Sequence, residues 1–157
     1  MPVPAALERL ITTVDEEETR QLGARLAQRA RPGDLLALYG DLGVGKTQLA
    51  KGFGRGLGVA ATINSPSFVL MAEYLGRLPF FHIDLYRLAD AADALAGGVL
   101  DERQAAGVAL VEWADRLAGA LPEERLDVVF EGAGDDPRRI SLRAIGGDYA
   151  RYLEVAG

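Results

Sequence analysis

One stretch of the chain, Gly40–Thr47, combines the residue types that a loop needs to hold the phosphates of a nucleotide. It fits the pattern G-x-x-x-x-G-K-[ST] at every fixed position. Its glycines allow backbone N–H groups to approach phosphate oxygens, Lys46 supplies positive charge for the β- and γ-phosphates, and the Thr47 hydroxyl can ligate Mg²⁺. The residues expected to contact the nucleotide are Asp41, Leu42, Gly43, Val44, Gly45, Lys46, Thr47 and Gln48.

The residues on either side of this loop indicate how it is positioned. Leu35–Tyr39 is an apolar run typical of a buried parallel strand, and Leu49, Phe53 and Leu57 fall on one face of a helix. A helix that begins at the loop directs the positive end of its dipole at a bound anion. A glycine-rich turn without a ligand is the alternative, and this strand–loop–helix context favours nucleotide binding.

Two carboxylates follow apolar runs, and each is a candidate partner of the phosphate loop. Asp84 ends the run 80–84, and Glu112 ends the run 108–112. A Mg²⁺–nucleotide site needs a carboxylate at the end of a buried strand, to hold the ion or its waters. The sequence does not decide between the two. Our working division of roles between the two carboxylates is that Glu112 binds the metal together with Thr47. Asp84 then contacts the metal ligands, without binding the metal itself, or positions the attacking water. For each, the alternative is a strand-end carboxylate in solvent. The candidate catalytic residues are Asp84, Glu112 and Lys46, and the candidate metal ligands are Thr47, Glu112 and Asp84.

Helix signals occur before and after the phosphate loop. Asp15 is a typical N-cap, followed by three glutamates in a first helical turn, and we expect this helix to continue to Pro32. The helix after the loop contains Gly52, Gly54 and Gly56, each of which costs about 1 kcal/mol relative to alanine. These glycines indicate either a close-packed helix face or a short helix.

The remaining elements complete an alternation of strands and helices. Ser67–Tyr74 and Leu78–Leu85 predict an antiparallel hairpin around residues 76–77. Further strands are expected at 7–14, at the edge, and at 125–130 and 139–143, with helices at 88–100 and 148–155. This order predicts an α/β fold, a P-loop NTPase-like three-layer sandwich whose sheet is mostly parallel with an antiparallel edge. We expect a single P-loop ATPase domain over residues 1–157.

The composition argues against several classes of protein. The chain has no cysteine and a net charge of −6. Disulfides and cysteine-based metal sites are therefore excluded, and direct binding of nucleic acid is disfavoured because it usually needs a basic patch. No apolar run reaches the roughly 18 residues of a membrane span, and the N-terminus lacks a signal-peptide pattern. We expect a cytoplasmic protein that makes no membrane contact.

Four stretches of the chain, Gly40–Thr47, Ser65–Phe68, His82–Arg87 and Glu112–Asp115, occur in the order of a known family. Together they resemble the TsaE (YjeE) family of small bacterial P-loop ATPases. The phosphate loop is shared with many ATPases, whereas the family's H-x-D-x-Y-R motif followed by E-W is much more specific. The family usually has threonine where this chain has Ser67, and the hydroxyl is retained.

The resemblance implies an activity, cofactors and partners. Members of the family are cytoplasmic ATPases needed to make threonylcarbamoyladenosine beside the anticodon of tRNAs that read codons starting with A. They work with TsaD, which carries the transfer chemistry, and with TsaB. By this resemblance the chain binds ATP and Mg²⁺, hydrolyses ATP slowly when alone, and meets tRNA only indirectly through its partners.

The resemblance also implies roles for individual residues. Lys46 would bind the β- and γ-phosphates, Thr47 and Glu112 would bind Mg²⁺, and Asp84 would be required for hydrolysis. Trp113, the only tryptophan, lies near the nucleotide or fills the core, and the sequence weights these equally. Taken alone, His82 would be a core-facing strand histidine. The resemblance gives roles to three further stretches. Ser65–Phe68 would form a loop that responds to the nucleotide, and His82, Tyr86 and Arg87 would surround Asp84. Asp15–Thr19 would contribute to the adenine pocket.

Two other functions fit part of the pattern. A small-molecule kinase would need an arginine-rich lid and an acceptor pocket, and only Arg138 and Arg139, in an expected strand, form a comparable cluster. A nucleotide-dependent interaction module would bind without turnover. ATP is favoured over GTP because the chain contains neither an N-K-x-D base-reading motif nor a D-x-x-G segment.

Overall fold

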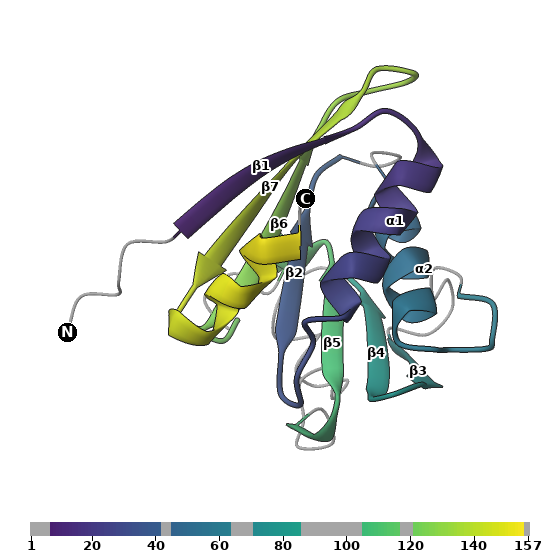
Figure 1. Ribbon diagram of the computed structural model, residues 1–157, viewed down its shortest axis with the longest axis vertical. Coiled ribbons are helices and arrows are strands. Elements are labelled where there is room, and N and C mark those ends of the chain that lie inside the picture. Colours follow the sequence, from purple (N-terminus) through teal and green to yellow (C-terminus); the bar gives the residue numbers. More distant parts are fainter. Residues whose placement is uncertain (1–6, 42–44, 64–70, 86–104, 117–120, 156–157) are drawn as a thin grey trace.

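A mixed β-sheet of seven strands forms the centre of the described structure (Figure 1). The computed structural model describes residues 7–41, 45–63, 71–85, 105–116 and 121–155. Across the sheet the strands run in the order β1-β7-β6-β2-β5-β4-β3. Their bounds are β1 Leu7–Thr13, β2 Leu35–Tyr39, β3 Met71–Leu75, β4 Pro79–Asp84, β5 Val108–Glu112, β6 Arg125–Glu131 and β7 Arg138–Ile145.

The four central strands are parallel, and both edges of the sheet are antiparallel. β2 pairs in parallel with β6 and β5, and β5 pairs in parallel with β4. β3 is antiparallel to β4, and β7 is antiparallel to β6 and β1. The predicted α/β fold, the N-terminal edge strand and the hairpin around residues 76–77 are therefore confirmed. A second antiparallel edge arises because β6 and β7 pair as a hairpin, whereas the sequence pattern predicts only two strands there.

The helices flank this sheet and begin close to where the sequence placed them. Their bounds are α1 Glu16–Ala27, α2 Lys46–Gly56, and the short 3₁₀ helices η2 Ala114–Arg116 and η4 Gly147–Val155. Figure 1 shows α1 and α2 next to each other on one side of the sheet, with η4 beside β6 and β7. None of the helices in the described ranges is both long and apolar enough to cross a membrane.

The start of α1 matches the predicted cap, whereas its end does not match the predicted stop. The Asp15 carboxylate accepts a hydrogen bond from the Glu18 backbone N–H at 2.8 Å, as expected for an N-cap. The helix ends at Ala27, before Pro32. Arg77, in the β3–β4 turn, donates to the carbonyl oxygens of Ala27 and Ala30 at 2.8 and 3.2 Å. This long-range contact satisfies the carbonyls at the helix end, which the local sequence pattern does not reveal.

Apolar side chains pack on both faces of the sheet. The larger cluster lies between the sheet and α1, α2 and η4. A smaller cluster covers the opposite face and includes Leu35, Ala37, Phe81 and Ile83. All five residues of β5 are buried, as expected for a central parallel strand. The helix predicted at 88–100 lies outside the described residues.

Glycines allow α1 and α2 to approach each other closely. A β-carbon on Gly52 would lie 1.8 Å from the carbonyl oxygen of Arg20, and one on Gly56 would lie 2.5 Å from that of Ala24. The backbones of the two helices are therefore in direct contact. Of the two alternatives left by the sequence, these glycines mark a close-packed face.

We expect Gly52→Ala to destabilise the protein, although alanine is the better helix former. Helix propensity alone would add about 1 kcal/mol to the free energy of unfolding. The added β-carbon would instead separate two backbones, and overpacking of this kind costs about 1–3 kcal/mol. Chemical denaturation should give a lower free energy of unfolding for Gly52→Ala, and a change within about 0.5 kcal/mol for Lys51→Ala beside it. A free energy equal to or above that of the parent would contradict the close contact.

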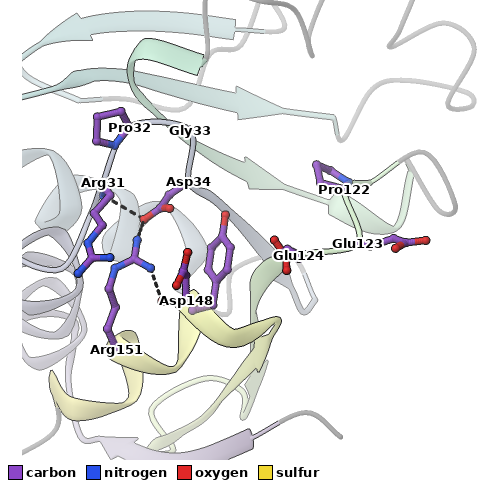
Figure 2. A pocket seen from close by; sticks show the side chains of 10 residues that line it. Arg31, Pro32, Gly33, Asp34, Pro122, Glu123, Glu124, Asp148 and Arg151 are labelled. Carbon is purple, nitrogen blue, oxygen red and sulfur yellow. Dashed lines mark hydrogen bonds and ion pairs between the residues drawn. The ribbon is translucent and has the colours of Figure 1, made fainter. Parts of the chain in front are cut away.

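Asp34, just before β2, fixes the last helix of the chain to the sheet. Its Oδ2 accepts hydrogen bonds from the Tyr152 hydroxyl at 2.5 Å and the Arg31 backbone N–H at 3.0 Å, and it forms an ion pair with Arg151. Burial and this carboxylate raise the pKa of Tyr152. Figure 2 shows Asp34 and Arg151 at a pocket of about 650 Å³. The pocket lies at the amino end of β2, whereas the phosphate loop follows its carboxyl end.

Candidate functional site

The junction between β2 and α2 is built so that the helix N-terminus is open to a ligand. Gly45 is the N-cap of α2 with φ = 112°, and no side chain caps the helix there. Only glycine adopts this φ without strain. The first N–H groups of α2 are therefore available to an anion, which the helix dipole also favours. Leu42, Gly43 and Val44 of the predicted loop lie outside the described residues.

Lys46, the first residue of α2, is 4% exposed. Its Nζ donates a hydrogen bond to the carbonyl oxygen of Gly40 at 2.5 Å and lies 3.5 Å from the centroid of the Trp113 ring. Burial lowers the pKa of Lys46, and nearby carboxylates oppose that shift. Those carboxylates are Glu112, Asp84, Asp115 and Asp41. The ammonium is thus held at the loop in an acidic surrounding.

The two predicted carboxylates are brought together by strand pairing. Asp84 and Glu112 are register partners at the carboxyl ends of β4 and β5, and the Leu85 backbone N–H donates to the Glu112 carbonyl oxygen at 3.2 Å. β5 also pairs in parallel with β2, which leads into the phosphate loop. Parallel neighbours end at one edge of a sheet, so both carboxylates lie beside the loop.

Glu112 makes contacts with two other elements of the site. Its Oε1 and Oε2 accept a hydrogen bond from the Thr47 hydroxyl at 3.2 and 3.4 Å. Its Oε2 also lies 2.5 Å from Nε2 of His82. Glu112 is 3% exposed, whereas Asp84 is partly exposed. The structure thus joins Glu112 to Thr47, the pair that the working division placed together.

Trp113 follows Glu112 in a backbone conformation rare for a large side chain. Its φ is 58°, in the left-handed region. The ring is partly buried, lies over Lys46 and packs against the apolar cluster on the sheet face opposite α2. The ring therefore contacts the phosphate-loop lysine and also packs against the core, and its contact with a nucleotide stays a prediction.

Two residues of α1 lie near the loop, and Arg20 is the one that the sequence does not predict as part of the site. Arg20 of α1 donates to Oε1 of Gln48 at 2.6 Å and pairs with Glu17 at 2.9 Å. Thr19, in the segment expected near adenine, is buried and would lie 3.9 Å from a β-carbon on Gly45. No pattern in the sequence around Arg20 predicts its contact with Gln48. Thr47 and His82 lie 65 and 30 residues from Glu112 along the chain. No local sequence pattern therefore predicts their hydrogen bonds with Glu112.

The fold and this junction define the class of the protein. The four central strands are parallel, β2 leads through a glycine-rich loop into α2, and carboxylates end the neighbouring strands. This arrangement is a P-loop NTPase fold. The family described as "Threonylcarbamoyl adenosine biosynthesis protein TsaE" matches residues 13–140. The chain belongs to the TsaE family, and the resemblance seen in the sequence is confirmed.

Individual relatives agree with this assignment. The chain is 46% identical over 144 residues to the "tRNA threonylcarbamoyladenosine biosynthesis protein TsaE" of Bacillus subtilis, covering 90% of this chain and 89% of that protein. The TsaE protein of Treponema pallidum is 35% identical over 126 residues, covering 80% of this chain and 93% of that one. The crystal structure of Bacillus subtilis YdiB matches with a TM-score of 0.79 and 39% identity, covering 95% and 93% of the two chains.

The Thr47–Glu112 contact predicts a difference between two conservative substitutions. Thr47→Val keeps the shape of the side chain but leaves the buried carboxylate without this donor. We expect it to lower the free energy of unfolding by about 1–3 kcal/mol, since a lost hydrogen bond to a charged group has this cost. Thr47→Ser retains the hydroxyl and should stay within about 0.5 kcal/mol of the parent. Chemical denaturation without nucleotide measures both, and equal stabilities for the two variants would contradict the contact.

Proposed function

We propose that this chain is an ATPase that supports formation of threonylcarbamoyladenosine in tRNA, working in the cytoplasm with counterparts of TsaD and TsaB. Membership of the TsaE family supports the biosynthetic role. The observation that carries the ATPase proposal is the arrangement of Lys46, Thr47 and Glu112 around the N-terminus of α2. Glu112 reaches this point from β5, a neighbour of the strand that leads into the loop.

The residues of the site fit Mg²⁺ and the phosphates of ATP. The uncapped N-terminus of α2 and the Lys46 ammonium offer N–H donors and positive charge for phosphate oxygens. The Thr47 hydroxyl and the Glu112 carboxylate are oxygen donors, the type that Mg²⁺ prefers. These two residues would hold the ion, and when bound Mg²⁺ would supply charge neutralisation at the phosphates. Asp41, Gly45 and Gln48 flank the same position.

The protein's own groups have separate tasks in the proposed hydrolysis. Lys46 stabilises negative charge on the phosphoryl group that is transferred. Asp84, the register partner of Glu112 and the more exposed of the two, orients the attacking water. Trp113 covers Lys46 from one side, which limits the access of bulk water to the ammonium. A low local dielectric strengthens each of these electrostatic interactions.

The acidity of the chain supports a role as an energising subunit. With a net charge of −6, it is poorly suited to hold tRNA by itself, so the partners would bind the RNA. ATP binding and hydrolysis here would then drive a change in the partner complex. This proposal assigns the transfer of the threonylcarbamoyl group to the TsaD counterpart.

We expect the purified chain to hydrolyse ATP slowly and to become faster when its TsaD and TsaB counterparts are added. Lys46→Ala should lower the rate of the mixture by about 100-fold or more, the cost of removing an electrostatic stabiliser of the transition state. Lys51→Ala, which changes the only other lysine, is the matched control and should keep the parent rate. Phosphate release measured over time tests this.

Other results of that experiment would redirect the proposal. An unchanged rate on mixing would contradict the coupling to TsaD and TsaB. A phosphorylated small molecule formed from a metabolite pool would favour a kinase, and partner association that depends on Lys46 without any hydrolysis would favour an interaction module.

The proposed division between the two carboxylates gives a further expectation. Glu112→Gln removes a charged oxygen donor beside Thr47 and should raise the Mg²⁺ concentration needed for half-maximal nucleotide binding by about tenfold or more. Asp84→Asn should leave that concentration within about threefold of the parent and lower turnover by about 100-fold. Calorimetric titration and phosphate release measure the two quantities. Reversed phenotypes would assign the metal to Asp84 instead.

A further inference from the structure

His82 is a buried polar residue that the mechanism above leaves without a task. Its exposed fraction is 0%, and Nδ1 is buried with no hydrogen-bond partner among the residues that the structure describes. The ring is stacked on Phe80, with centroids 6.1 Å apart and an interplanar angle of 9°. A hydrogen bond links its Nε2 to Oε2 of Glu112 at 2.5 Å. A polar ring with an unpartnered nitrogen is a poor core residue, so packing alone does not explain it.

We propose that His82 is a positioning residue that fixes the rotation of the Glu112 carboxylate. This inference rests on the proposed function, in which Glu112 and Thr47 hold Mg²⁺. The hydrogen bond from Nε2–H goes to Oε2, and Oε1 is the oxygen nearer to the Thr47 hydroxyl, at 3.2 Å against 3.4 Å for Oε2. The oxygen needed by the metal is then already in place before the ion binds.

The placement of His82 on β4 explains how it reaches Glu112. Alternate residues of a strand share a face, so Phe80 and His82 point to the same side of the sheet. Phe80 packs against Phe53 of α2, with ring centroids 5.3 Å apart. His82 is therefore on the side from which α2 brings Thr47. β4 and β5 are parallel neighbours, which puts Glu112 within reach of the ring.

The surroundings of the ring also decide which nitrogen carries its proton. A carboxylate only accepts hydrogen bonds, so Nε2 must be the donor to Glu112. The geometry thus requires a proton on Nε2, which donates toward the carboxylate. Metal ligands are commonly oriented by such hydrogen bonds from neighbouring groups.

The tautomer can be read directly, because His82 is the only histidine of the chain. We expect long-range ¹H–¹⁵N correlation spectra of the tag-free, ¹⁵N-labelled protein to show one imidazole that carries a proton on Nε2. A ring protonated at Nδ1 alone would overturn the proposal, since Nε2 would have no proton to donate. This measurement needs neither nucleotide nor turnover.

Two amide substitutions then separate positioning from packing. The Gln side chain places its amide near the position of Nε2, whereas the shorter Asn side chain places it near Nδ1. With a non-hydrolysable ATP analogue at fixed concentration, MgCl₂ is titrated and binding is followed by calorimetry and by the fluorescence of Trp113. We expect His82→Asn to raise the Mg²⁺ midpoint about tenfold or more, and His82→Gln to stay within about threefold of the parent. Thermal melts confirm that each variant is folded at the temperature used.

The outcomes distinguish this inference from the function on which it rests. A parent protein without Mg²⁺-dependent binding of the analogue would overturn the proposed function and, with it, the task given to His82. Normal Mg²⁺ dependence in the parent, with midpoints equal among folded His82→Asn, His82→Gln and parent proteins, would overturn the positioning role alone. Equal losses in both amide variants would overturn it as well, because a packing residue would behave in that way.

Discussion

The burial of the Glu112 carboxylate is the constraint on which the site depends. A charge that is 3% exposed is costly unless donors satisfy it. The donors come from Thr47 at the start of α2 and from His82 on β4, while Glu112 itself ends β5. Three elements must therefore be correctly packed before the carboxylate is stable. The same packing places the phosphate-loop helix beside the ends of the parallel strands.

The position of α2 follows from packing more than from helix propensity. Its three glycines make it a weak helix former, yet Gly52 and Gly56 let its backbone contact that of α1. On its other side, Phe53 reaches Phe80 of β4. The helix is thus held between α1 and the sheet, which keeps its N-terminus, with Lys46 and Thr47, in place. Sequence features that weaken the isolated helix strengthen its tertiary contacts.

The two ends of β2 serve different purposes. At the amino end, Asp34 joins Arg151 and Tyr152 of η4 to the sheet, a contact that links the chain terminus to the fold. At the carboxyl end, Lys46 and Thr47 of α2 lie near the carboxylates of Asp84 and Glu112. Ligand sites of open α/β sheets are expected at this carboxyl edge. Structural ion pairing and candidate chemistry are therefore separated along one strand.

The sequence by itself determined the features that short segments encode. The phosphate-loop pattern, the apolar runs of β2 and β5, the Asp15 cap and the β3–β4 hairpin each depend on neighbouring residues, so the sequence alone predicts them. The sequence also supplied both carboxylates of the site. It did not pair His82 with Glu112, place Trp113 over Lys46 or end α1 at Ala27. Those features depend on strand order and helix approach, which bring together residues far apart in the chain, so only the tertiary structure decided them.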